Sequence, residues 1–242
     1  FDEAYGGLGG KSTDLMIVME QFGKGLVVEP YLPTVILAGG LISKLGSEEQ
    51  KNSIIPEIIS GNVRCAFAYA EPQSRFDLND VKTTAVLNGD DYVLNGFKSV
   101  VFGAGMASHL IISARTDGDQ RSESGITLFI VDTKSDGLTL QNYPTIDEYR
   151  ASEVIIENLK VSKDNVLGEV NMAYDAIEEI VDISTIAACS EAVGILQVLK
   201  DSTTEYCKNR KQFGQSIAKN QVIQHRLVDM MIEYEQAKSI LY

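Results

Sequence analysis

Apolar residues recur at helical spacing over residues 12–60. Positions three or four apart place one face of a helix against a core. Ser47 followed three residues later by Gln50 forms a capping-box signal, and Gly61 is a suitable stop after the helix that this box opens. The pattern predicts an N-terminal helical domain over residues 1–61.

After residue 61 the apolar period changes to two, which is the spacing of β-strands. The strand candidates are Val63 to Ala70, Thr83 to Leu87, Tyr92 to Leu94, Leu110 to Ala114, Ile126 to Asp132 and Val154 to Leu159. Asn88-Gly89 and Asn95-Gly96 are favourable tight-turn dipeptides. Strands this closely spaced favour an antiparallel barrel or sandwich over βαβ units. We expect a middle β domain over residues 62–166.

Beyond Gly168 the helical period returns and continues to about Arg210, and a second apolar stripe runs from Asn220 to Tyr242. Two antiparallel helices bury only one face each, so they need partners from elsewhere in the protein or from another subunit. The pattern predicts an incomplete C-terminal helical bundle over residues 167–242. The overall fold class is therefore α+β and multi-domain, and we expect the chain to be part of a longer protein.

Charge and cysteine content exclude several classes of function. Thirty-four acidic residues against twenty-one basic ones give a net charge of −13, which repels nucleic acid. No apolar run reaches the roughly 20 residues that cross a bilayer, so no membrane span is expected. Cys65, Cys189 and Cys207 are an odd number without CxxC spacing, which predicts a reducing, cytoplasmic location. The start FDEAYGGLGG lacks the features of a signal peptide.

Several familiar motifs fail on inspection. The segment GGLGGKS is not a Walker A loop, because the position five residues before Gly10 is Tyr5. The glycine-rich GAGMAS that begins at Gly103 lies between two strand candidates, so we interpret it as a turn. His109 and His225 have no metal-ligand spacing and no GxSxG elbow is present, so neither a metal site nor a hydrolytic triad is predicted.

The order of segments is more informative than any single motif. Helices are followed by FAYAEPQSRFD, then by a β domain containing VLNGFKSVV, then by long helices containing RKQFGQSIAKNQVIQHRLVDM. Together with EAYGGLGG and LGSEEQKNSIIPEIISG, this series resembles the acyl-CoA dehydrogenase family over nearly the whole chain. The resemblance implies FAD as cofactor and the α,β-dehydrogenation of an acyl-CoA thioester, with hydride transfer to the flavin. Protein groups would position the thioester and supply a carboxylate base.

The resemblance places flavin contacts in the β domain. Phe67, Tyr69 and Ala70 match a strand that runs along the flavin ring, where the family usually has a Thr in place of Ala70. Val100 and Phe102 stand at the Trp and Thr positions of the family's KxWxT pattern. Apolar side chains pack against a ring but form no hydrogen bond to it. The alternative interpretation of these residues is ordinary β-domain core.

Two residues are implied as substrate contacts. Arg75 and Phe76 replace the family's Gly-Ser beside the pantetheine of CoA. An Arg there can pair with a CoA phosphate or a substrate carboxylate through its planar guanidinium group. The alternative is a solvated loop arginine.

The RKQFG segment matches the family's RxxFG motif. The resemblance implies that Arg210 reaches the FAD pyrophosphate of a neighbouring subunit and that Phe213 packs near its adenine end. Guanidinium and diphosphate form charge-assisted bidentate bonds. Gln212 and Gln221 are secondary candidates for the same contact.

No catalytic residue is assigned. Some family members carry the base on the first long helix, where this chain has Ser184, with Thr185 at a position where Arg is common. Glu191, on another face, is interpreted as an ordinary helix residue. Other members carry the base about ninety residues beyond RxxFG.

The leading hypothesis is an acyl-CoA dehydrogenase subunit that acts with an electron-transfer acceptor in a homo- or hetero-oligomer, a dimer or tetramer. The alternative is a non-catalytic partner subunit that completes the flavin site of its mate. EPQSRFD and FKSVV also resemble the small subunits of two-component dehydrogenases for pimeloyl-CoA-like or steroid-derived acyl-CoA substrates. Relatives of the acyl-CoA oxidase or nitroalkane oxidase type share the expected fold, so the sequence leaves them open.

Overall fold

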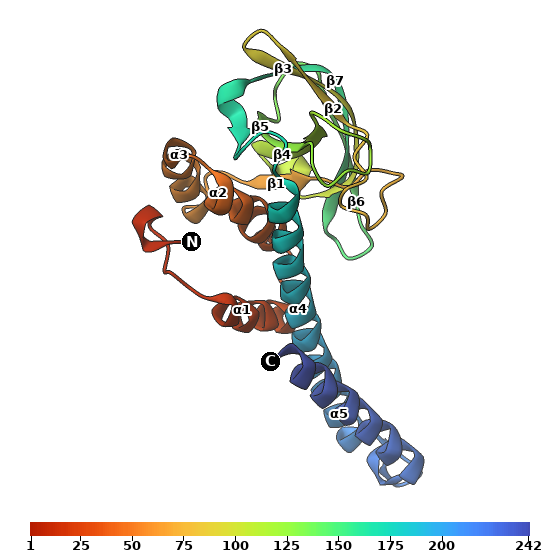
Figure 1. Cartoon of the computed structure of the whole chain (residues 1–242). Helices are drawn as coiled ribbons and strands as arrows, with labels where there is room; N and C mark the ends of the chain where they lie inside the picture. Colours follow the sequence, from red (N-terminus) through yellow and green to blue (C-terminus); the bar gives the residue numbers. More distant parts are fainter. The chain divides into compact units, whose positions relative to one another are not determined.

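A computed structural model describes all 242 residues, Phe1–Tyr242 (Figure 1). Contacts divide the chain into two compact units. The first unit comprises residues 1–9 and 28–184, and the second comprises residues 10–27 and 185–242. None of the helices combines the length and the apolar character that crossing a bilayer requires. The three domain boundaries expected from the sequence stay a prediction.

The first unit begins with short helices. They are the 3-10 turn η1 (Glu3–Tyr5), the π-helix η2 (Leu32–Ala38), α2 (Gly39–Leu45) and α3 (Glu48–Ile59). The predicted capping box opens α3. The Gln50 N–H donates to Ser47 Oγ at 3.2 Å, and the Ser47 N–H donates to Gln50 Oε1 at 3.0 Å. The helical character predicted for this region is confirmed.

One eight-stranded sheet forms the rest of the first unit. Its strands are β1 (Cys65–Ala68), β2 (Thr84–Asn88), β3 (Asp91–Phe102), β4 (His109–Arg115), β5 (Ile126–Asp132), β6 (Leu138–Pro144), β7 (Arg150–Ser162) and β8 (Val166–Leu167). The order is β6-β7-β3-β2-β4-β5-β8, with β1 on β4. Most pairs are antiparallel as predicted, but β1 and β2 each pair with β4 in parallel. The 3-10 turns η3 (Ala104–Met106) and η4 (Lys163–Asn165) lie between strands.

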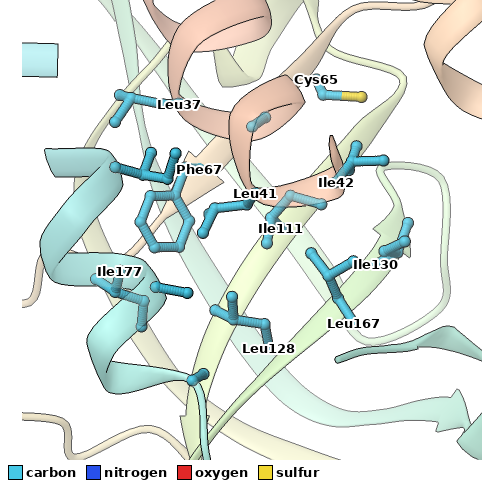
Figure 2. Packing of buried hydrophobic residues seen from close by; sticks show 14 of the residues in the cluster. Leu37, Leu41, Ile42, Cys65, Phe67, Ile111, Leu128, Ile130, Leu167 and Ile177 are labelled. Atoms are coloured by element: carbon cyan, nitrogen blue, oxygen red, sulfur yellow. The ribbon is translucent and has the colours of Figure 1, made fainter. Parts of the chain in front are cut away.

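Strands β1, β4 and β5 are buried on both faces, which explains their continuous apolar character. Figure 2 shows the core on one face, where Leu41 and Ile42 of α2 pack with Phe67, Ile111 and Leu128. The start of α4 (Tyr174–Asn209) contributes to this cluster. The opposite face forms a second core with side chains of β3 and β7.

The sheet coils strongly around this second core. Tyr92 of β3 and Phe129 of β5 are not on neighbouring strands, yet their ring centroids lie 5.1 Å apart in an edge-to-face arrangement of 62°. β3 therefore faces β5 across the enclosed apolar layer.

One of the two predicted turns is wrong. Asn88-Gly89 joins β2 to β3 as expected, with Gly89 at φ 68°. Asn95-Gly96 lies inside β3 at a register shift against β7. A Cβ on Gly96 would stand 2.4 Å from Thr83 Oγ1, so this glycine serves the close approach of the Thr83 segment and not a turn.

The second unit is helical. It contains α1 (Ser12–Gly25), the rest of α4, the two-residue strands β9 (Lys211–Gln212) and β10 (Gln215–Ser216), the turn η5 (Ile217–Lys219) and α5 (Gln221–Leu241). Both long helices were predicted. The backbones of α1 and α4 touch, because a Cβ on Gly194 would lie 2.0 Å from the Glu20 carbonyl oxygen. The Glu20 carboxylate accepts from Tyr242 at 3.1 Å and pairs with Lys24 at 2.9 Å, which ties the end of α5 to α1.

Candidate functional site

The residues predicted to bind cofactor or substrate fall into both units. The first unit holds Phe67, Tyr69, Ala70, Arg75, Phe76, Val100 and Phe102. The second holds Arg210, Gln212, Phe213 and Gln221.

In the first unit, the chain just after β1 runs beside β3. The Ser99 N–H of β3 donates to the Ala70 carbonyl at 2.9 Å. The Phe67 ring is buried in the first core (Figure 2). It stacks on the Tyr69 ring, with centroids 4.9 Å apart and planes at 29°. Its side chain is therefore committed to packing, and only its backbone remains for a ligand. We call the paired segments 69–71 and 98–102 the β1–β3 seam.

The surface of the β1–β3 seam combines apolar side chains with an open backbone donor. Val100 and Phe102 are 46% and 45% exposed, which is high for apolar residues on a strand. Val100 has φ 53°, an uncommon conformation for a β-branched residue. The half-buried Ala70 has an N–H that donates to no acceptor in the protein. Apolar surface beside a fixed polar donor is typical of a small-molecule site.

A buried ion pair lies under the seam. Lys98 Nζ of β3 stands 2.8 Å from Glu71 Oε1, and the two side chains are 0% and 2% exposed. The ammonium also donates to Ser113 Oγ at 3.0 Å and to the Tyr69 carbonyl at 3.3 Å. Its three protons thus have three acceptors. The Glu71 carboxylate in turn accepts from the Thr83 N–H at 3.0 Å.

Burial and pairing act against each other on both groups. Burial lowers the pKa of Lys98 to about 8, although Glu71 opposes the shift. Burial would raise the pKa of Glu71, but Lys98 and the hydrogen bonds to the carboxylate outweigh it and hold that pKa below its ordinary value. Both groups are therefore charged at neutral pH.

Arg75 and Phe76 lie at the tip of a turn that leaves the seam. Arg75 has φ 50° and is exposed, and Phe76 is 96% exposed. The far end of the loop is held by the Arg115 guanidinium group. This group donates to the carbonyls of Asn79, Gln120, Ser122 and Ser124 at 2.7–2.8 Å. The ends of the loop are fixed while its tip faces solvent.

In the second unit, the predicted residues lie at the turn between α4 and α5. Arg210, Gln212, Phe213 and Gln221 are all exposed, and Phe213 has φ 53°. The backbone beneath them is tied down, because the Ile217 N–H donates to the Arg210 carbonyl at 2.9 Å. The turn therefore exposes the Arg210 guanidinium group and the Phe213 ring on a backbone that is held by hydrogen bonds.

No catalytic base is assigned in either unit. Ser184 and Thr185 lie within α4, as expected for the family position that they match. The sequence interpretation missed the ion pair between Lys98 and Glu71. The signal available for it was a lysine within the largely apolar strand segment FKSVV.

Comparison with known proteins agrees with this architecture. The acyl-CoA dehydrogenase N-terminal domain matches residues 1–62, the middle domain matches residues 66–159 and the C-terminal domain matches residues 174–242. The three matches follow one another along the chain and leave only short gaps. The chain belongs to the acyl-CoA dehydrogenase family.

Several relatives are similar over their shared length. The caffeyl-CoA reductase-Etf complex subunit CarC of Acetobacterium woodii is 36% identical over 99% of this chain, and the 3-(aryl)acrylate reductase of Clostridium sporogenes is 34% identical over 98%. The structure of butyryl-CoA dehydrogenase from Megasphaera elsdenii matches the whole chain at a TM-score of 0.92 with 30% identity. The chain spans 64% of the length of each of the two reductases and 65% of the solved structure.

Proposed function

We propose that the protein containing this chain is an FAD-dependent acyl-CoA dehydrogenase. The reaction removes a proton from Cα and a hydride from Cβ of an acyl-CoA thioester, and the flavin accepts the hydride. The observation that supports this proposal most directly is the β1–β3 seam. There the open Ala70 N–H lies beside exposed apolar side chains of β3, which suits a flat ring system that carries hydrogen-bond acceptors.

The residues of the seam fit the flavin with specific roles. Ala70 would donate a backbone hydrogen bond to the ring, and Val100 and Phe102 would pack against it. Tyr69 and Phe67 would contribute backbone atoms. The Phe67 side chain is excluded from contact with the flavin because its ring is buried. The hydroxyl groups that the family usually has at Ala70 and Phe102 are missing here, so the side chains at these positions would hold the ring by packing alone, and the hydrogen bond would come from the Ala70 backbone.

The residues of the α4–α5 turn would serve the distal part of a cofactor. Arg210 suits a pyrophosphate because its guanidinium group is exposed and always charged. Phe213 would pack on an adenine, with Gln212 and Gln221 nearby as further polar contacts. We propose that this cofactor is held by another subunit, which makes the enzyme an oligomer.

Arg75 and Phe76 are the proposed substrate contacts, with Arg75 facing a CoA phosphate or a substrate carboxylate. The electron acceptor is proposed to be an electron-transferring flavoprotein, because one relative is named as a subunit of a complex with Etf. A cytoplasmic location is supported by the three cysteines, none of which forms a disulfide.

Two relatives are named as reductases, so the same site chemistry in reverse is a second direction to consider. In that direction a bound flavin would supply the hydride that Cβ of an α,β-unsaturated thioester takes up, and Cα would take up a proton. The alternative of a subunit without a catalytic role finds no support in the relatives, which are named as dehydrogenases or reductases.

Flavin content and anaerobic bleaching test the proposal. We expect the full-length protein to contain about one FAD per subunit, measured by absorbance near the approximate 450 nm flavin band. Anaerobic addition of a saturated acyl-CoA should bleach that band. Absence of flavin, or flavin that neither saturated nor unsaturated acyl-CoA changes, would contradict the proposal.

Arg75→Ala tests the substrate contact separately. It should raise the apparent Kd for acyl-CoA by about tenfold, the value of one charge-assisted bond, with unchanged flavin content. Lys82→Ala removes a nearby exposed cation outside the loop tip and is the matched control.

A further inference from the structure

The buried pair of Lys98 and Glu71 contacts the proposed flavin site through the backbone, because Lys98 Nζ donates to the Tyr69 carbonyl. The site requires neither charge for contact with a ligand, since both side chains are shielded from solvent. A buried ion pair also gives little net stability compared with apolar residues of similar volume. Neither ligand contact nor stability therefore explains why this ion pair is buried within the seam.

The geometry of one peptide group supplies an explanation. The Tyr69 carbonyl and the Ala70 N–H belong to the same planar peptide, and in a trans peptide they point in opposite directions. Lys98 Nζ holds that carbonyl at 3.3 Å, and no cis peptide occurs in the chain. Because the ammonium lies on the carbonyl side, the Ala70 N–H points away from it, to the side without a protein acceptor.

The ammonium also acts on the strength of the donor. A cation at the carbonyl oxygen polarises the peptide, and hydrogen bonds in a chain strengthen one another in a low-dielectric interior. Glu71 fixes the ammonium in place, and the Ser99 N–H fixes the next carbonyl, that of Ala70, at 2.9 Å. The direction of the Ala70 N–H is thus fixed, and its strength as a hydrogen-bond donor is increased, before any ligand binds.

We propose that Lys98 is a positioning residue for the flavin. Its ammonium orients and polarises the Tyr69–Ala70 peptide, whose N–H would donate to the flavin ring, and Glu71 holds the ammonium in place. This inference rests on the proposed function. It adds that the hydrogen bond to the flavin ring depends on a charge that never touches the cofactor.

The double variant E71Q/K98M separates this role from a purely structural one. It removes both charges together and leaves no unpaired ion, so the free energy of unfolding should stay close to that of the wild type. Flavin affinity should nevertheless fall about tenfold, in the range of one hydrogen bond, and the visible absorption bands of the bound flavin should shift.

Ser190→Ala is the control for the loss of a buried hydrogen bond. The Ser190 hydroxyl is buried and donates to the Ile186 carbonyl, a bond that involves neither Lys98 nor its partners, so flavin affinity and spectrum should match those of the wild type. Should the Met variant not fold, E71Q/K98Q provides a neutral polar pair that lacks the ammonium charge.

The outcomes distinguish this inference from the proposed function. A wild-type protein that binds no FAD overturns the proposed function. A wild-type protein that binds FAD, with a folded double variant of equal affinity and unchanged spectrum, overturns the role of Lys98 alone.

Discussion

The β1–β3 seam and the α4–α5 turn are two proposed cofactor-binding surfaces, one in each unit, and they are built in opposite ways. In the seam, charges are buried and every proton of Lys98 has an acceptor within the protein. In the turn, Arg210 and Phe213 are exposed, and only the backbone beneath them is tied down. Single changes that leave a buried charge of the seam unpaired should therefore act on folding, whereas changes in the turn should act on binding alone.

The largest effect is expected from Lys98→Met alone. This change leaves the Glu71 carboxylate buried without its partner, which costs about 3–5 kcal/mol of unfolding free energy. Urea unfolding followed by circular dichroism measures the cost. A loss under about 1 kcal/mol would show that water reaches the carboxylate and that the seam is not closed as described.

Arg210→Ala should show the opposite behaviour. We expect flavin affinity to fall about 10- to 100-fold, because a hydrogen bond to a charged group contributes roughly 1.5–3 kcal/mol. The free energy of unfolding without flavin should change by less than about 0.5 kcal/mol. Flavin titration and urea unfolding report the two quantities. Lys211→Ala, next in sequence and also exposed, should leave affinity close to the wild type.

Gly96→Ala is expected to act on the seam through packing. Its new Cβ would collide with Thr83, whose N–H donates to Glu71, so strand β3 or the Thr83 segment must shift. Overpacking of this kind costs about 1–3 kcal/mol in thermal or urea unfolding. Lys160→Ala on the neighbouring strand β7 is exposed and should change little. Equal stability of the two variants would contradict the close approach.

The smallest effect concerns acid. The pKa of Glu71 is held below its ordinary value of 4.5, so this group stabilises the fold above that pH. The contribution is lost as the pH falls through the lower folded pKa. Urea unfolding between pH 7 and pH 3 should therefore show a shallower acid loss in Glu71→Gln than in the wild type. If the free energies of unfolding of the two proteins fall in parallel with pH, Glu71 does not contribute to the acid dependence of stability.

The sequence predicted local structure well where one signal dominated. The capping box at Ser47 and Gln50 is present because it involves only neighbouring residues. Strand β5 was predicted with its observed bounds, since a short run rich in β-branched and aromatic residues is typical of a buried strand. Strand β6 was missed because most of its side chains are exposed and its apolar alternation is limited to Leu138 and Leu140.

The candidate site could be predicted in position but not in chemistry. Sequence order placed Ala70 and Val100 in the right segments, and the structure brings these segments together through the bond between Ser99 and Ala70. The misplaced turn at Asn95-Gly96 shows the limit of local reasoning. Its glycine is required by Thr83, a residue whose proximity no dipeptide pattern reveals.

The amino-acid sequence by itself determined the helical and β segments, the acidic balance and the family, because periodicity and ordered motifs are local properties of the chain. Only the tertiary structure decided that Lys98 is buried against Glu71, that the Phe67 ring belongs to the core and that the Ala70 N–H is open. Burial and hydrogen bonding depend on which distant segments fold against each other. The role of a residue in the site therefore depends on spatial neighbours that cannot be identified from the sequence around that residue.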